Sequence, residues 1–191
     1  CSSDLVHAIE GYITKNAWEM TDMMHLKAIE IISKWLRKSV EGDMEAREKM
    51  ALGQYIAGMG FSNVGLGIDH SMAHPLSAFY DIPHGVACAI LLAPVLTFNA
   101  SATGERYREV ARAMGVADVD TMSQDEYRQA AIDACQKLAD DVGIPRKLSE
   151  LGVQEKDIDF LADSAMADAC TPGNPRDVEK SQIVALYKSI L

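Results

Sequence analysis

The chain has 191 residues, the size of one ordinary domain. Its 18 Lys and Arg against 28 Asp and Glu leave a formal charge of −10, which argues against a surface for nucleic acid or for an anionic membrane. Hydrophobic residues make up 48% and charged residues 24%, so the composition is that of a folded protein and excludes a disordered chain.

Helical signals dominate the first half of the chain. Residues 28–36 place apolar side chains at a spacing of three to four, and Asp43 is suited to cap a helix that begins at residue 44. The longest apolar run, residues 86–96, is far shorter than the about 20 residues that span a bilayer. Because it also contains Pro94, we interpret it as a buried core helix.

The second half is also predicted to be helical. Ser123 and Glu126 form a capping box before an amphipathic stretch, and Gly143 stands where that helix should end. Residues 155–169 and 177–190 predict further helices, with loops expected at 99–104 and 171–176. No segment alternates with a period of two, so we predict a single all-α domain over residues 1–191.

Neither the cysteines nor the glycines match a known binding motif. The cysteines show no CxxC spacing, so they indicate neither a disulfide framework nor a zinc knuckle, and we expect reduced thiols and a cytoplasmic location. No GxGxxG or GxxxxGK motif is present. A glycine-rich stretch at residues 58–67 favours close approach between packed backbones over a phosphate cradle. The four cysteines are Cys1, Cys88, Cys135 and Cys170.

Three of the five histidines fall within fifteen residues, at His70, His74 and His84. His70 and His74 are four residues apart and therefore share one face of a helix. Pro75 and Pro83 should bend the chain so that His84 returns toward the same point. Imidazole is a good ligand for Fe²⁺, Zn²⁺ or Ni²⁺, so this cluster indicates a metal site, with unrelated surface histidines as the alternative.

The other two histidines each follow an aspartate by three residues. Asp4 and His7 are equally consistent with a ligand pair and with an acid in the first turn of a helix. His25 has no further support, so we interpret it as ordinary helix surface or packing. Within the cluster, Asp69 and Asp81 are candidates to orient an imidazole, and solvated surface acid is the equal alternative.

Three segments resemble the C-terminal half of the iron-dependent (group III) alcohol dehydrogenases. They are HAIEGYI at residues 7–13, the long glycine and histidine block at residues 58–85, and CTPGNPR at residues 170–176. The similarity runs from His7 to the C-terminus. It implies a helical metal-binding domain that follows an α/β domain for NAD(H) in the whole enzyme, which acts on small alcohols, diols or hydroxyaldehydes and forms a homodimer.

The resemblance also assigns roles to single residues. It implies that His7, His70 and His84 bind a catalytic Fe²⁺, with zinc possible. His74 matches a histidine near the nicotinamide and the substrate that does not bind the metal. Phe61 and Cys170 match positions that line the substrate pocket.

Two departures from the family pattern are visible. The family's aspartate ligand lies four residues before the first histidine, where this chain has Ser3, and Asp4 is one residue too late. Either the sequence is altered at this point, or Asp4 serves as the fourth ligand from the same helix face. Nothing in the chain corresponds to the nucleotide domain, so we expect it to be part of a two-domain enzyme.

Two alternatives remain. One is a zinc enzyme of the same superfamily that resembles glycerol dehydrogenase. The other is a catalytically incomplete helical module that binds metal or only packs against a partner.

Overall fold

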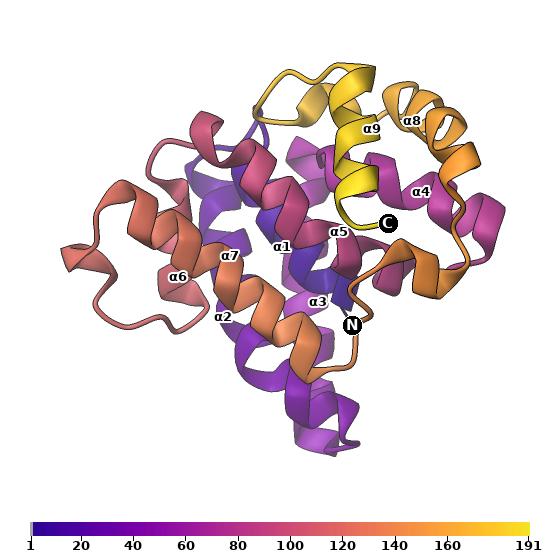
Figure 1. The fold of residues 1–191 in the computed structure, drawn as a ribbon. Helices are drawn as coiled ribbons and strands as arrows, with labels where there is room; N and C mark the ends of the chain where they lie inside the picture. The colour runs from indigo at the N-terminus through magenta and orange to yellow at the C-terminus, as the bar shows by residue number, and fades with distance from the viewer. Residues whose placement is uncertain (1) are drawn as a thin grey trace.

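The computed structural model describes residues 2–191, with side chains from residue 3. Every element over this range is helical, as predicted, and short 3₁₀ turns join several of the helices (Figure 1). The α-helices are α1 (Ser2–Ile13), α2 (Glu19–Val40), α3 (Met44–Val64), α4 (Ile68–Tyr80), α5 (His84–Asn99), α6 (Arg106–Ala113), α7 (Gln124–Asp141), α8 (Ile158–Met166) and α9 (Lys180–Ser189).

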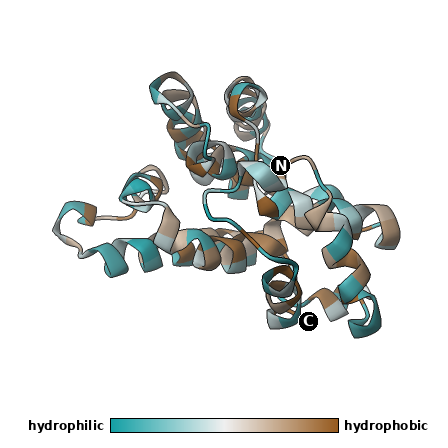
Figure 2. Ribbon diagram, turned by 90° about the horizontal axis from the view of Figure 1, so that it is seen from above, coloured by the Kyte–Doolittle hydropathy of each residue, from teal (hydrophilic) through white to brown (hydrophobic). Residues whose placement is uncertain are grey.

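Helices α1 and α5 form the centre of the molecule. α1 packs against α2, α3 and α5, while α5 also packs against α4 and α7. α2 and α3 form an antiparallel hairpin on one side, and α8 and α9 pack together beside α4 on another (Figure 1). The outer helices carry hydrophilic and hydrophobic residues side by side, the amphipathic pattern of helices with one face against a core (Figure 2).

The apolar run at residues 86–96 is a core helix, as expected. It lies within α5, where Ala87, Leu91, Val95 and Leu96 are at most 1% exposed. Residues 84–102 are long and apolar enough to cross a bilayer by length and composition alone. The burial of α5 among other helices accounts for that composition, because a central helix is apolar on most of its surface.

The local capping signals also hold. The Asp43 carboxylate accepts a hydrogen bond from the Ala46 N–H at 2.8 Å and starts α3. Ser123 and Glu126 form the expected capping box of α7. Gly143, just past the end of α7, adopts a φ of 79°. Residues 99–104, expected as a loop, contain a 3₁₀ turn at Ala100–Ala102.

The sequence predicts that the chain bends at both Pro75 and Pro83, but the turn between α4 and α5 begins only after Tyr80. Pro75 lies inside α4, which continues to Tyr80. The chain reverses after it, at Asp81, whose left-handed φ of 53° ends α4, and at Pro83, which precedes α5. Pro83 thus has the predicted effect and Pro75 does not.

The His25 ring lies between three helices, packed against glycines of two of them. Its ring on α2 is fully buried, and a Cβ added at Gly11 on α1 or at Gly60 on α3 would collide with it. Only glycine at both positions leaves room for the ring. This confirms the interpretation of His25 as a packing residue. The close approach at Gly60 is to the side chain of His25 and not to a backbone, and Gly58 and Gly65 have no neighbour within 4 Å of an added Cβ, so the expected backbone approach is not found at these positions.

Candidate metal centre

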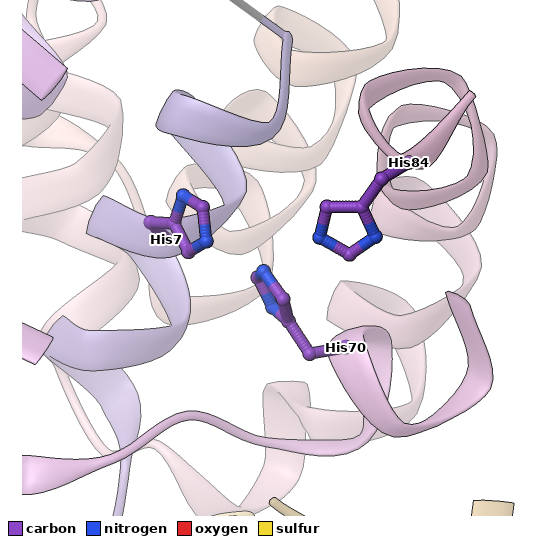
Figure 3. Close-up of side chains that lie close together, drawn as sticks. All are labelled: His7, His70 and His84. Carbon is purple, nitrogen blue, oxygen red and sulfur yellow. The ribbon is translucent and has the colours of Figure 1, made fainter. Parts of the chain in front are cut away.

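His7, His70 and His84 converge from three helices. His7 comes from α1, His70 from the first turn of α4 and His84 from the first residue of α5. One ring nitrogen from each lies within 4.8 Å of the others. Figure 3 shows the three rings around one shared space. The fold therefore brings His7 of α1 next to the histidines of the block at residues 58–85, which the sequence could only suggest.

Glu10 holds His70 in place. One Glu10 carboxylate oxygen lies 2.7 Å from His70 Nδ1, and both side chains are 2% exposed. The other oxygen accepts a hydrogen bond from the Asp69 N–H at 2.7 Å. Gly67, the N-cap of α4, has no side chain to cap these groups, so Glu10 from α1 takes that role. A carboxylate at a helix N-terminus is also favoured by the helix dipole.

This contact defines the free nitrogen of His70. Since Nδ1 donates to the Glu10 carboxylate, Nε2 carries the lone pair. Nε2 is buried and has no hydrogen-bond partner. Buried polar atoms are seldom left unpaired, and an unpaired imidazole nitrogen facing two other imidazoles is the arrangement of a metal ligand set. The residues present therefore fit a divalent metal with nitrogen ligands.

The electrostatics of the cluster favour neutral rings. Burial, followed by the neighbouring His70 and His84, lowers the pKa of His7 to about 3. Burial, followed by His70 and His74, also lowers the pKa of His84. Only a neutral imidazole has a lone pair for a metal, so these rings are ready to bind one at neutral pH.

His74 borders the cluster from the outside. Its ring stacks on His84 with centroids 5.5 Å apart and an interplanar angle of 16°. Its Nδ1 lies 2.7 Å from a carboxylate oxygen of Asp168, and the His74 side chain is 43% exposed. Although His70 and His74 share a helix face, one ring points to the buried centre and the other to its solvent side.

Phe61 and Cys170 lie next to different histidines of this arrangement. The Phe61 ring stacks on His7 with centroids 4.6 Å apart. Cys170 and Asp168 lie close enough to His74 that their ligand atoms are within 4.8 Å of one another. Burial, together with the adjacent Asp168 carboxylate, raises the pKa of the Cys170 thiol to about 12. Cys170 is therefore a neutral thiol beside His74.

Asp4 lies one turn before His7 on α1. It is buried and lines a cavity of about 490 Å³ together with Ser39, Arg47 and Met50 from α2 and α3. Burial raises the pKa of its carboxyl group. Its carboxylate is not part of the group of ligand atoms that His7, His70 and His84 form, as far as the described residues go.

Neither acid expected beside the histidines orients a ring. Asp81 is exposed and ends α4. Asp69 is fully buried, and both of its carboxylate oxygens are without a hydrogen-bond partner. Burial, followed by the nearby Glu10, raises the pKa of Asp69 well above its ordinary value. The orienting acids are Glu10 and Asp168, which the sequence did not single out.

A cluster of imidazoles with a free buried nitrogen at the centre of a helical domain has the ligand chemistry of a metal-binding domain. The chain belongs to the Fe-containing alcohol dehydrogenase family, since residues 3–191 match the model of that family's C-terminal domain. It is 60% identical over 183 residues to lactaldehyde reductase of Escherichia coli strain K12, covering 96% of this chain and 48% of that protein.

Further comparisons support the same family. The chain is 39% identical to 1,3-propanediol dehydrogenase of Citrobacter freundii, covering 96% of this chain and 48% of that protein. A crystal structure of a 1,3-propanediol oxidoreductase superposes with a TM-score of 0.96 at 38% identity, covering all of this chain and 50% of that one. The chain thus spans about half the length of the relatives it matches. The family resemblance and the all-α fold are both confirmed.

Proposed function

We propose that residues 1–191 are the metal-binding catalytic domain of an NAD(P)-linked alcohol dehydrogenase or aldehyde reductase. Its substrates would be small alcohols, diols or hydroxyaldehydes of the kind that lactaldehyde reductase acts on. The observation that carries the proposal is the unpartnered, buried Nε2 of His70 between His7 and His84. Membership of the Fe-containing alcohol dehydrogenase family supports it.

In this proposal His7, His70 and His84 hold Fe²⁺ or Zn²⁺. The bound metal would act as a Lewis acid on the oxygen of the alcohol or aldehyde. Glu10 orients His70 and keeps its coordinating nitrogen free of a proton. We propose no fourth protein ligand, because the described ligand atoms that gather with those of the three histidines do not include the Asp4 carboxylate.

In this proposal His74 moves the proton. Its ring lies beside the histidine cluster and its side chain is exposed to solvent, so a proton that it takes from the substrate oxygen can pass to water. Phe61 and Cys170 would bound a small, partly apolar pocket on either side. The hydride itself belongs to the nicotinamide, and the protein's contribution is orientation.

Binding of NAD(H) is assigned to a nucleotide domain outside these residues. The relatives are about twice as long as this chain, which supports that division. The whole enzyme would be a homodimer in the cytoplasm. A zinc enzyme resembling glycerol dehydrogenase is separated from this proposal by turnover of lactaldehyde, 1,2-propanediol and glycerol.

Metal analysis of single variants tests the ligand set. His70→Ala and His84→Ala should lose the bound metal, whereas His74→Ala, a matched change in the same cluster, should keep it and slow turnover. Elemental analysis after loading with Fe²⁺ or Zn²⁺ gives the occupancy. Full occupancy in His84→Ala would contradict the assignment.

A module without enzymatic activity is tested with NADH. Titration of the 191-residue chain alone should show no tight binding, because no residue set for the nucleotide is assigned to it. Turnover should appear once the chain is produced together with a nucleotide-binding half. Metal binding without turnover in that longer protein would favour the module.

A further inference from the structure

Asp168 is fixed by several contacts besides the one to His74. One of its carboxylate oxygens accepts a hydrogen bond from the Cys170 N–H at 2.8 Å. The Ser71 hydroxyl lies 3.4 Å from the same oxygen and 2.8 Å from the Thr171 hydroxyl. The second oxygen, which these groups do not reach, lies 2.7 Å from His74 Nδ1. The carboxylate is therefore oriented by its surroundings before it contacts the histidine.

The charge of Asp168 supports this arrangement. Partial burial pushes the pKa of its carboxyl group upward, but the hydrogen bonds from the Cys170 N–H and from His74 outweigh it. The net pKa lies below its ordinary value, so the group is ionised at neutral pH. An ionised carboxylate accepts hydrogen bonds only, which means that His74 Nδ1 must be the donor.

The other ring nitrogen of His74 is thereby defined. A neutral imidazole carries one proton, so Nε2 of a ring that donates through Nδ1 has the lone pair. The ring is held beside the metal cluster by its stacking on His84. A base with a fixed lone pair next to the reacting oxygen is what proton transfer requires.

We propose that Asp168 is a positioning residue that locks His74 in the Nδ1–H form and presents Nε2 to the substrate oxygen. The inference rests on the proposed dehydrogenase function. In alcohol oxidation the O–H bond of the substrate breaks and its proton goes to Nε2 of His74. The C–H bond of the carbon that carries this oxygen breaks as well, and its hydride goes to the oxidised nicotinamide. Asp168 then faces the imidazolium that has formed, and the proton passes to water. Reduction of an aldehyde runs the same steps backwards.

The substitution Asp168→Asn tests this because the local hydrogen bonds fix how the new side chain lies. The Cys170 N–H requires an acceptor, so the amide oxygen takes that place and the amide NH₂ faces His74 Nδ1. The ring must then accept through Nδ1 and carry its proton on Nε2. Asp163→Asn, on α8 and exposed, is the matched control, since it removes a carboxylate of the same region that does not contact His74.

Nitrogen-15 NMR of the zinc-loaded 191-residue chain reads the tautomer directly. We expect the protonated nitrogen of His74 to be Nδ1 in the unchanged chain and in Asp163→Asn, and to be Nε2 in Asp168→Asn. Asp168→Ala, which removes the acceptor, should give a mixture of both forms and replaces Asp168→Asn if that variant does not fold. An unchanged tautomer in the folded variants would overturn the proposal.

Kinetics in the protein that also contains the nucleotide-binding half supply the second measurement. Asp168→Asn should lower kcat by at least about 10²-fold, the usual contribution of a positioned acid or base, with KM little changed. A flipped tautomer with unchanged kcat would also overturn the proposal. Failure of the dehydrogenase function itself would be recognised separately, because no substrate would then be turned over by the unchanged protein while the tautomer could still be read.

Discussion

Two carboxylate–histidine pairs with the same contact belong to the histidine cluster, one buried and one at its solvent side. Glu10 and Asp168 each approach Nδ1 of their histidine to 2.7 Å. The Glu10–His70 side chains are 2% exposed, whereas His74 and Asp168 are 43% and 19% exposed. The same contact therefore occurs once in a buried and once in an exposed environment. We expect this difference in exposure to decide what each pair contributes to stability and to function.

The buried pair is part of the fold as well as of the site. Glu10 satisfies backbone N–H groups of α4 in addition to His70, so its loss leaves several buried donors without partners. When one partner of the exposed pair, His74 and Asp168, is lost, water can reach the groups that remain. Because water replaces a lost partner only on the exposed side, we expect stability to depend on Glu10 and function to depend on both acids.

The largest effect is expected for Glu10→Ala. Glu10→Ala leaves three buried donors without their acceptor, the N–H groups of Asp69 and His70 and Nδ1 of His70. An unsatisfied buried donor costs about 1–3 kcal/mol, so with partial relaxation we expect a total of about 3–5 kcal/mol. We therefore expect Glu10→Ala to lower the free energy of unfolding of the 191-residue chain by about that amount. Denaturant-induced unfolding, followed by circular dichroism, measures it. A loss below about 1 kcal/mol, the range of exposed ion pairs, would remove the distinction between the two pairs.

Glu10→Gln is the control for this variant. It keeps the size of the side chain and one oxygen for the Asp69 N–H, so the fold should persist. Its amide NH₂ would face His70 Nδ1 and move the ring proton to Nε2, the coordinating nitrogen. We expect the affinity for Zn²⁺, measured by competition with a chelator, to fall about 10–100-fold, as is usual when the acid behind a metal-bound histidine is changed.

His25 shows what burial does to a histidine that lacks a carboxylate. Both of its ring nitrogens are buried and unpaired, and burial, followed by the charge of Arg106, lowers its pKa from 6.5 to about 4. Between these values the unfolded chain binds a proton that the folded chain does not, so stability falls as the pH drops from about 6.5 to about 4. The full shift corresponds to on the order of 3 kcal/mol.

The variant His25→Asn isolates this contribution. Its absolute stability should be lower, because the smaller side chain leaves space between α1 and α3, but its stability should depend less steeply on pH. Unfolding measured with a metal chelator present, at several pH values from about 7 to about 4, gives the two slopes. Equal slopes for the two chains would show that His25 does not titrate in this range.

The features of the fold that depend on neighbouring residues, such as helix starts, could be predicted from the sequence. Asp43 and Ser123 lie next to the N–H groups that they cap, so the starts of α3 and α7 could be read locally. The convergence of His7 with the histidine block came from the family resemblance, since spacing alone left Asp4 and His7 open. The spacing predicts a bend at Pro75, yet α4, which packs against α5 and α8, runs through this proline to Tyr80.

The two orienting acids could not be found in this way. Glu10 is 60 residues from His70 and Asp168 is 94 residues from His74, so each pair is created only by the packing of distant helices. Asp69 and Asp81 were nearer in sequence and more plausible as partners, but a helix points neighbouring residues in different directions. Spacing therefore treated His70 and His74 as equivalent, whereas their environments make them different.

The smallest effect is expected for the stability of Asp168→Ala. Exposed ion pairs contribute about 0–1 kcal/mol, and water can reach His74 once the carboxylate is gone. Because Asp168 also accepts from the Cys170 N–H, we expect a loss near the upper end of this range. Unfolding under the conditions used for Glu10→Ala measures it, with Asp163→Asn as the control for a change in surface charge. A loss as large as that of Glu10→Ala would show that the exposed pair is a structural element of the fold, and the comparison between the two environments would fail.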